Sequence, residues 1–596
     1  MSDGVSQPFF FGDDTRPLFG VLHRASPGAT LGLVLCNPFG FESICAHRTL
    51  RHIADEAAAA GIPALRFDYD GSGDSAGSDS DPDRLGAWLR SVHGAADELK
   101  RVTGCTRIAL LGVRLGATLA TLAAAERDDV AGVIALAPVV SARTYLRELR
   151  AMQSASVGTA SSMGGDAASQ PALEAMGFIV SAETRDALSA IDLAKAARAP
   201  APHVLILDRQ DLPVAEKWHA ALAAQGVSAE RQVLPGYVEM MLAPHSSIVP
   251  AAMLDATRQF LAARRAAPSP AVATATAAAP AGDVTRTSVL QDAGDGTRVR
   301  ESVEYVDASR TVFGVLTAPR DATPRSAIVL LSAGATHHIG PSRLYVTLAR
   351  QWAALGYAVF RMDVSGIGDS RPHPGEPENV VYTRHAAQDV AATANWLRAK
   401  VGVAECYALG LCAGAYHAFK AAVGGVPLDG VVMINPLTFF WKDGMSLDEK
   451  LADQRVIQGA AYYRKNAFSG AIWRKLLRGE VNVLNVAQIV LSRAAVTLRH
   501  ATRDVAKFLN LKVSDDLGRE LETVAGRGTN MLFVFADHEP GIELLRLQGG
   551  SAVGKLRDAR KLDLQIIPNA DHTFTAWAAR QQLTSYLVAA MSLIAP

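Results

Sequence analysis

The sequence predicts an α/β protein made of two tandem copies of one domain, each with a mostly parallel β-sheet flanked by helices. Two observations carry this prediction. Short runs rich in β-branched residues end in Gly, Pro, Asp or Asn and alternate with Ala- and Leu-rich helical stretches. This alternation is typical of parallel sheets that are covered on both faces. The same runs also recur in the same order in the two halves of the chain.

Four pairs of segments carry the duplication. They are "RPLFGVLHRASPGATLGLVLCNPFG" (16–40) with "RTVFGVLTAPRDATPRSAIVLLSAG" (310–334), "GIPALRFDYDGSGDSAG" (61–77) with "GYAVFRMDVSGIGDS" (356–370), "IALLGVRLGATLA" (108–120) with "YALGLCAGAYHAF" (407–419), and "GVIALAPVV" (132–140) with "GVVMINPLT" (430–438). The period is too long for a solenoid repeat, so the pattern indicates two copies of one domain.

The two copies are separated by a stretch of small residues and proline. Residues 266–282 read "AAPSPAVATATAAAPAG", with no periodicity, which is typical of a linker. A chain of 596 residues also exceeds what one core normally organises. We therefore expect domains at 1–265 and 284–596, joined by an Ala/Pro-rich linker at 266–283.

Composition excludes several function classes. Lys plus Arg number 59, as do Asp plus Glu, so bulk charge does not favour nucleic acid or a membrane surface. The N-terminus lacks a signal pattern, and no apolar run is long enough to span a membrane. The cysteines are few, odd in number and without metal-ligand spacing, which predicts neither disulfides nor a metal site and favours a reducing cytoplasm. They are Cys36, Cys45, Cys105, Cys406 and Cys412.

The second half places a cysteine at a strand-to-helix corner. In "YALGLCAGAY" (407–416) an apolar run leads into G-x-C-x-G with Cys412 at its centre, and a "D-x-x-G-x-G-D-S" strand end precedes it. These elements resemble the α/β-hydrolase fold, most closely the serine aminopeptidase-like group of small esterases and acyl hydrolases. The fold class implied is thus two tandem α/β-hydrolase domains. In that family an acid after a late strand and then a histidine follow the nucleophile.

The resemblance implies a Cys412–Glu539–His572 triad. The strand "NMLFVFADHEPG" (530–541) ends with Glu539 at the acid position and Asp537 as the alternative acid, and "LQIIPNADHTF" (564–574) ends at His572. Histidine would take the thiol proton, the acid would fix the imidazole, and the helix N-terminus would favour thiolate. The backbone N–H of Ala413 and a donor near Ala335 are the expected oxyanion donors.

Other polar residues near these motifs have structural interpretations. We expect His337 and His338 to form an exposed loop pair, with a role in shaping the oxyanion loop as the alternative. Carboxylates of the repeated strand ends are expected to hold turns rather than to do chemistry; they are Asp68, Asp74, Asp363 and Asp369.

The first half lacks the chemistry of the second. Its nucleophile position is Arg114, which cannot attack a carbonyl. The acid position survives as Asp211, but Glu239 stands where His572 stands in the second half. These three residues predict a charge-compensated cluster in a degenerate domain, although anion binding by Arg114 stays open.

A cysteine nucleophile shifts the expected chemistry towards acyl transfer. Its thioester intermediate is close in energy to a coenzyme A or carrier-protein thioester, so acyl groups can pass on and off. Polyhydroxyalkanoate synthases and dienelactone hydrolases, which resemble this site in using G-x-C-x-G, show transfer and hydrolysis respectively. No cofactor or metal is implied.

An expected cap at about 437–530 bears on the substrate. It combines the apolar run "VNVLNVAQIVL" (481–491) with many basic residues, a combination that suits an acyl chain on an anionic carrier such as coenzyme A or an acyl carrier protein. A solvated helix face over core residues is the plainer interpretation. The basic residues are Arg464, Lys465, Arg474, Lys475, Arg478, Arg493, Arg499, Arg503 and Lys507.

The sequence therefore predicts a cytoplasmic, cysteine-dependent acyl-transfer enzyme that works through a thioester acyl-enzyme, preceded by a degenerate copy. Two alternatives remain open. One is a thioesterase or esterase with the same residues and water as acceptor. The other is a non-catalytic scaffold.

Overall fold

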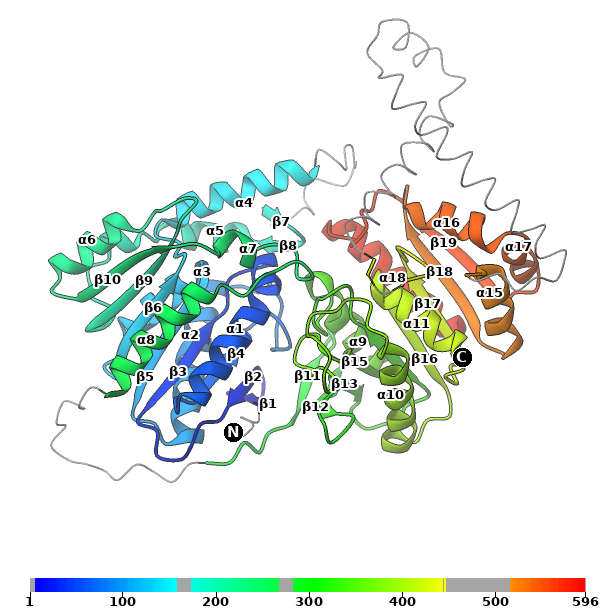
Figure 1. The fold of residues 1–596 in the computed structure, drawn as a ribbon, viewed down its shortest axis with the longest axis horizontal. Helices are drawn as coiled ribbons and strands as arrows, with labels where there is room; N and C mark the ends of the chain where they lie inside the picture. The colour runs from blue at the N-terminus through cyan, green and yellow to red at the C-terminus, as the bar shows by residue number, and fades with distance from the viewer. Residues whose placement is uncertain (1–5, 158–172, 267–281, 443, 446–514, 595–596) are drawn as a thin grey trace, which may run out of the picture. The chain divides into compact units, whose positions relative to one another are not determined.

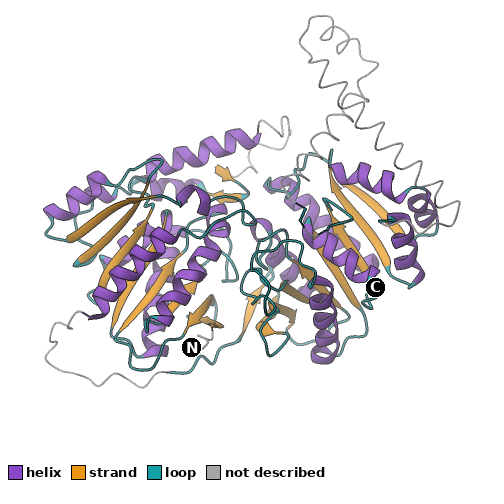
Figure 2. Ribbon diagram, in the orientation of Figure 1, coloured by secondary structure: helices purple, strands orange, loops and turns teal. Residues whose placement is uncertain are grey.

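The computed structural model describes residues 6–157, 173–266, 282–442, 444–445 and 515–594. Almost all of the expected linker at 266–283 lies outside these residues, as does most of the expected cap at 437–530 with its basic side chains. The described residues form two large, mostly parallel sheets flanked by helices (Figure 1; Figure 2). The predicted fold class is confirmed.

The first sheet has eight strands in the order β1-β2-β4-β3-β5-β6-β9-β10, and β2 alone runs against the others. Its central strands are buried along almost their whole length, as expected for a sheet covered on both faces. The strands are β1 (Ser6–Phe11), β2 (Leu18–His23), β3 (Leu31–Cys36), β4 (Ala64–Phe67), β5 (Arg107–Val113), β6 (Val130–Leu136), β9 (His203–Arg209) and β10 (Ser228–Leu234).

Two apolar layers cover this sheet. One layer packs side chains of α2, α3, α4 and α6 against it, and the other packs those of α1, α7 and α8. A small hairpin, β7 (Leu173–Ala175) with β8 (Phe178–Val180), precedes α5. The helices are α1 (Phe41–Ala59), α2 (Arg84–Thr103), α3 (Leu115–Ala124), α4 (Ala142–Val157), α5 (Ala182–Ser189), α6 (Glu216–Ala224), α7 (Tyr237–Met240) and α8 (Ala251–Ala266).

The chain divides into two compact units. The first comprises residues 1–325, 334–381 and 575–584, and the second comprises 326–333, 382–574 and 585–596. The first unit thus contains the whole first sheet and part of the second sequence repeat. The domain boundaries expected at 265 and 284 stay a prediction.

The second sheet has nine strands, which fall in both compact units. In the first unit, neighbouring strands in the order β11-β12-β13-β15 are antiparallel. In the second unit, β14-β16-β17-β18-β19 are parallel. The strands are β11 (Ser288–Asp292), β12 (Arg298–Tyr305), β13 (Phe313–Pro319), β14 (Ala327–Leu331), β15 (Ala358–Asp363), β16 (Cys406–Leu411), β17 (Gly430–Ile434), β18 (Asn530–Ala536) and β19 (Leu562–Ile567).

Helices connect the strands of this second sheet, as expected for parallel neighbours. In the second unit α11 packs against β16 and β17, and α15 packs against α16 and α17. The helices are α9 (Leu344–Ala354), α10 (Ala386–Val401), α11 (Ala413–Val423), α15 (Leu517–Gly526), α16 (Pro540–Gly549), α17 (Ser551–Asp558) and α18 (Trp577–Ile594).

Within the first compact unit, buried charges from the two sequence repeats exchange partners. Arg66 of β4 pairs with Asp369, and Arg361 of β15 pairs with Asp74. The two arginines occupy equivalent positions, because each stands two residues before the repeated "D-x-x-G-x-G-D-S" strand end. The same segment therefore supplies both a cation and an anion to this reciprocal contact.

The expectation that His337 and His338 are exposed is wrong. Both are buried, and His338 lies between two carboxylates, with Nε2 2.7 Å from Asp74 and Nδ1 2.9 Å from Asp363. His337 stacks on His47 with ring centroids 4.1 Å apart. The carboxylates do hold turns, since Asp68 and Asp363 accept backbone N–H groups of their own strand-end loops. Asp74, Asp363 and Asp369 also pair with buried cations, and the contacts of Asp74 and Asp363 fix the His338 ring.

Candidate active site

Cys412 occupies a strained corner between β16 and α11 in the second compact unit. Its φ of 58° and ψ of −115° lie outside the regions that L-residues normally adopt. The flanking glycines permit this corner: a Cβ on Gly410 would lie 2.1 Å from a backbone atom of Gly414, and one on Gly414 would lie 2.5 Å from Leu331 O. The close approach presents the cysteine side chain at the end of the parallel strands.

Cys412 differs from the other four cysteines in its exposure. It is partly exposed, whereas the others are buried. Burial raises the pKa of Cys36, Cys45 and Cys406 to about 12 in each case, and thiols of that kind are inert. Accessibility and position therefore single out Cys412 as the candidate nucleophile.

His572 and Glu539 form a close pair in the same unit. His572 Nδ1 lies 2.8 Å from Glu539 Oε1, a contact that fixes the ring and leaves Nε2 for another partner. Nε2 is buried, and no well-aligned hydrogen bond reaches it from the described residues. Catalytic hydrogen bonds are often poorly aligned before substrate binds. The missing contact at Nε2 therefore does not exclude His572 as the catalytic base.

The charge state of His572 depends on Cys412. Burial by itself lowers the pKa of His572, but interactions with Cys412 and then with Glu539 raise it well above its usual value. The alternative acid, Asp537, lies beside the exposed His538, with 3.4 Å between Oδ2 and Nε2. The structure thus brings together Cys412, His572 and Glu539.

Asn435 holds the two late strand ends in place. It follows β17 with a positive φ of 44°. Its Nδ2 donates to His572 O at 2.7 Å, and its Oδ1 accepts the Ala536 N–H at 2.8 Å. One buried side chain therefore fixes the segments that carry the base and the acid. Sequence reasoning missed this residue, although "MINP" after a buried strand marked a polar side chain at the sheet edge.

Tyr382 is a second residue that sequence reasoning missed. Its ring is buried, stacks on Trp441 at 4.1 Å between centroids, and lies edge-on to Tyr416 at 5.2 Å. Its hydroxyl has no hydrogen-bond partner among the described residues. Burial and then the charge of Cys412 raise its pKa well above the usual value, so the hydroxyl remains a donor. No motif surrounds Tyr382 in the sequence.

The two expected oxyanion donors, Ala413 and Ala335, belong to different compact units. Ala413 is the first residue of α11, and N–H groups in the first turn of a helix lack an intrahelical partner. Its backbone is therefore positioned to donate next to Cys412. Ala335 belongs to the first compact unit, and its role stays a prediction.

Arg114 occupies the equivalent corner of the first sheet, with φ 52° and ψ −119°. It is buried, its Nε lies 2.8 Å from Glu42 Oε1, and Nη2 pairs with Glu148. Its guanidinium also lies over the Tyr145 ring, 5.3 Å from the centroid. The cation is thus compensated by carboxylates from α1 and α4.

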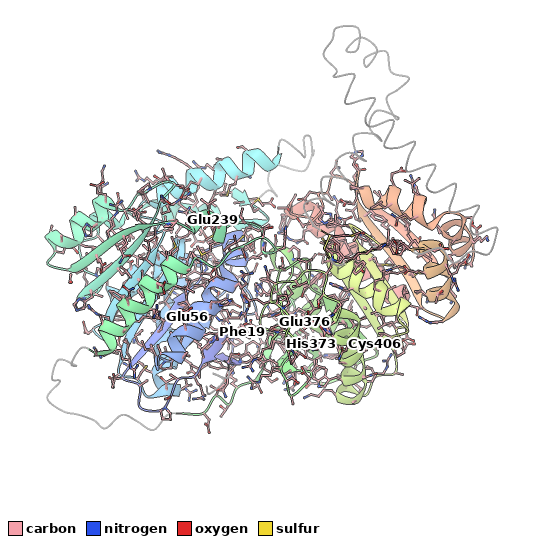
Figure 3. All side chains as sticks on the ribbon, viewed as in Figure 1. Phe19, Glu56, Glu239, His373, Glu376 and Cys406 are labelled. Atoms are coloured by element: carbon pink, nitrogen blue, oxygen red, sulfur yellow. The ribbon has the colours of Figure 1, made fainter. Side chains whose placement is uncertain are left out.

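The partners expected for Arg114 were wrong. Asp211 instead pairs with the neighbouring Arg209, and Glu239 is exposed on the short helix α7 (Figure 3). Long helices bring Glu42 and Glu148 to the corner in place of Asp211 and Glu239, which align with the acid and base of the other half. The first half therefore has neither a nucleophile nor a base at this corner.

In the described residues, no helix is long and apolar enough to cross a lipid bilayer. No group of three or more His, Cys, Asp or Glu in those residues is arranged to hold a metal ion.

Comparisons with known proteins give one family model and several solved structures that are similar to parts of this chain. The family model described as serine aminopeptidase, S33, matches residues 45–185 and 323–461. Similar solved structures include Est1E from Butyrivibrio proteoclasticus (18% identity, 44% of this chain and 99% of that chain, TM-score 0.30) and dienelactone hydrolase from Anabaena variabilis (11%, 49% and 97%, 0.28). A comparison with curated proteins gives no match. A region in each half therefore matches the serine aminopeptidase-like family, and the chain has the fold of two tandem α/β-hydrolase domains.

Proposed function

We propose that the second half of the chain transfers acyl groups through a thioester on Cys412. The observation that carries this proposal is the His572–Glu539 pair, 2.8 Å apart, in the same unit as Cys412 at its strained strand-to-helix corner. The match to a hydrolase family supports acyl chemistry in the broad sense. The thiol favours transfer, because a thioester intermediate exchanges readily with other acyl carriers.

The proposed reaction has two balanced steps. The thiolate of Cys412 attacks the acyl carbonyl carbon, the bond to the leaving thiol breaks, and Nε2 of His572 gives its proton to that thiol. An acceptor alcohol, amine or thiol then attacks the Cys412 thioester and yields its proton to Nε2, and Cys412 departs as thiolate. Glu539 stabilises the imidazolium before the first step and after the second. The Ala413 N–H would stabilise the oxyanion in both steps.

The class of acyl donor was inferred from the basic residues of the expected cap, and it stays a prediction. The basic stretch expected to meet coenzyme A or an acyl carrier protein lies outside the described residues. Hydrolysis is the second candidate function, and the hydrolase family match favours it. The two functions share every residue named above and differ only in the acceptor.

Intact-protein mass spectrometry separates these functions. After incubation with octanoyl coenzyme A, the protein is expected to gain one octanoyl group. This group should leave faster when a primary amine or alcohol is added than in water alone. Cys412→Ala should gain nothing, while Cys406→Ala, which alters a buried cysteine on the adjoining strand, should be acylated like wild type. Loss of the octanoyl group to water alone would establish hydrolysis. If acyl thioesters of several chain lengths all fail to give an adduct, a scaffold would be favoured.

Tyr382→Phe tests a second oxyanion donor. Because the Tyr382 hydroxyl is buried and has no partner among the described residues, we propose that it donates to the substrate carbonyl oxygen. Its removal should lower kcat by about 10²-fold, the usual effect of losing one such donor, with little change in KM. The melting temperature should not fall, since no hydrogen bond in the free protein is lost.

The matched control for this variant is Tyr407→Phe, which removes a buried tyrosine hydroxyl that pairs with Glu405. That change should leave kcat unaltered. An unchanged kcat in Tyr382→Phe would exclude the tyrosine from the reaction.

A further inference from the structure

The first compact unit contains a cavity of about 720 Å³, a size typical of small-molecule sites. All of its lining residues belong to that unit. The loop after β3, at Asn37–Gly40, forms one wall, and Leu115 and Leu119 of α3 form another. These segments adjoin Arg114, which does not line the cavity and stays bound to Glu42 and Glu148. The first half therefore contains a cavity although its nucleophile position is occupied by arginine.

Aromatic rings dominate one side of this cavity. Phe39 contacts both Trp88 and Phe178, with ring centroids 5.6 and 6.2 Å apart. Trp577 of α18 also lines the cavity. Such surfaces favour flat apolar groups, which gain both burial and ring contacts there.

The arginines that line the cavity are already committed to backbone carbonyls. Arg343 donates to four carbonyl oxygens of one loop, those of Gly71, Gly73, Ser75 and Gly77. Arg580 donates to Thr575 O and Gly177 O. Turning either guanidinium away would leave buried acceptors unpaired, which is costly. The donors that these carbonyls occupy are therefore withheld from a ligand, which weakens the attraction of the cavity for an anion.

Two other titratable groups that line the cavity, His337 and Asp68, bear on the charge and hydrogen bonding of a ligand. Burial, followed by repulsion from His47 and His338, lowers the pKa of His337 well below its usual value, so it is neutral. Burial and the charge of Asp74 raise the pKa of Asp68 to about 7. Asp68 Oδ2 accepts the Asp74 N–H at 2.9 Å, and Oδ1 has only a long contact of 3.4 Å with Asn37. Asp68 thus offers the cavity one hydrogen-bonding oxygen.

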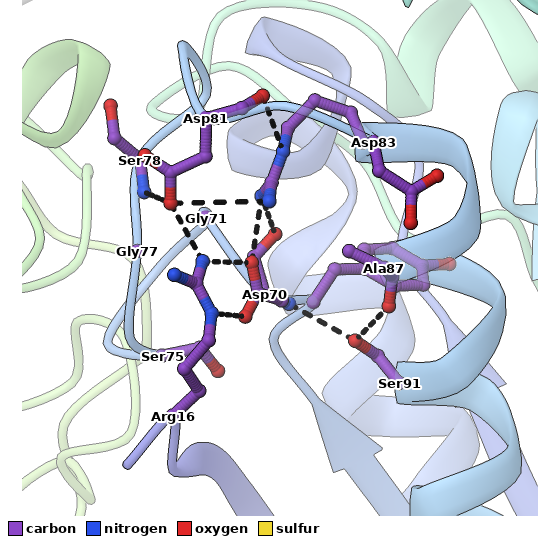
Figure 4. Close-up of polar contacts among 12 residues, drawn as sticks. Arg16, Asp70, Gly71, Ser75, Gly77, Ser78, Asp81, Asp83, Ala87 and Ser91 are labelled. Carbon is purple, nitrogen blue, oxygen red and sulfur yellow. Dashed lines mark hydrogen bonds and ion pairs between the residues drawn. The ribbon is translucent and has the colours of Figure 1, made fainter.

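The loop at residues 70–81 supplies polar residues to the cavity lining. It is held in place in the absence of a ligand. Asp70 accepts hydrogen bonds from both Arg16 and Arg84, and its N–H donates to Ser91 (Figure 4). Arg16 also reaches Asp81, on the far side of the loop (Figure 4). A wall fixed in this way loses little conformational entropy when a ligand binds.

We propose that this cavity binds, without chemical change, a neutral small molecule that has a flat aromatic body and an N–H or O–H group facing Asp68. The aromatic wall would hold the ring system, and Asp68 Oδ1 would accept the hydrogen bond. Cys412 does not line this cavity. The binding proposal can therefore be tested separately from the proposed acyl transfer.

A pair of fluorescent probes with the same ring system tests both the site and its charge preference. N-phenyl-1-naphthylamine is neutral and carries one N–H, and 8-anilinonaphthalene-1-sulfonate adds an anionic group. Titrated into the full chain, the neutral probe should bind with one site and accept excitation energy from Trp88 and Trp577. The anionic probe should bind at least tenfold more weakly. Alkylation of Cys412 with iodoacetamide should leave binding unchanged.

Two substitutions locate the binding. Leu119→Trp should fill the cavity and weaken binding of the neutral probe at least tenfold, and Phe39→Ala should weaken it by removing an aromatic wall. The control Leu212→Trp adds the same ring at an exposed position outside the cavity and should bind like wild type. Circular dichroism checks that each variant is folded. Undiminished binding in folded Leu119→Trp or Phe39→Ala would overturn the site, and equal or tighter binding of the anionic probe would overturn the ligand class.

Discussion

Cys412→Ala is expected to lower turnover of an acyl thioester by at least about 10³-fold, because the proposed covalent intermediate forms on this thiol. The four remaining cysteines are buried and cannot replace it. Turnover is measured by release of free coenzyme A from the thioester. A variant that keeps more than about a tenth of wild-type turnover would show that the acyl group is not carried on this sulfur.

The same variant makes a prediction about His572 that does not depend on knowing the substrate. Cys412 is a principal reason that the pKa of His572 lies well above its usual value, in opposition to burial. Removing the thiol should therefore lower the pKa of His572, although Glu539 still supports the charged form. NMR titration of the imidazole proton resonances measures this change, and Cys406→Ala is the control. An unchanged His572 pKa would mean that the sulfur and the ring do not interact.

The candidate site was largely predictable because its parts are tied to strand ends. Parallel strands end at one edge of a sheet, so a cysteine after one strand and a histidine after another were expected to meet there. The choice of Glu539 over Asp537 followed from the resemblance, which places the family's acid at this position after the late strand. No knowledge of helix packing was needed.

The residues that were missed or misplaced depend on packing between segments far apart in the chain. Glu42 and Glu148 reach Arg114 from two helices, and nothing in their local sequence marks them. Tyr382 comes from a loop without a motif. His338 sits in a loop of small and polar residues, which normally indicates exposure, but carboxylates from both repeats enclose it. Such buried polar groups become visible only when their partners are known.

His338 completes the charge balance of a buried network in the first compact unit. The network contains three carboxylates and two arginines, so its charges cancel only when His338 is protonated. Accordingly, although burial lowers the pKa of His338, Asp363 and Asp74 raise it to about 10, from 6.5 in the unfolded chain. The contacts run along the series Asp363, His338, Asp74, Arg361, Glu301 and Arg350.

Replacing His338 with glutamine should therefore destabilise the first compact unit by about 3–5 kcal/mol at neutral pH, the usual cost of breaking a buried ion pair. Because the folded-state pKa lies above the unfolded one, the stabilisation from protonated His338 is complete below pH 6.5 and is lost as the pH rises through about 10. The melting temperature of wild type should fall between pH 7 and pH 10 by more than that of His338→Gln. His219→Gln, at a partly exposed histidine, should follow wild type at every pH. Parallel curves for wild type and His338→Gln would mean that the buried imidazole is not charged.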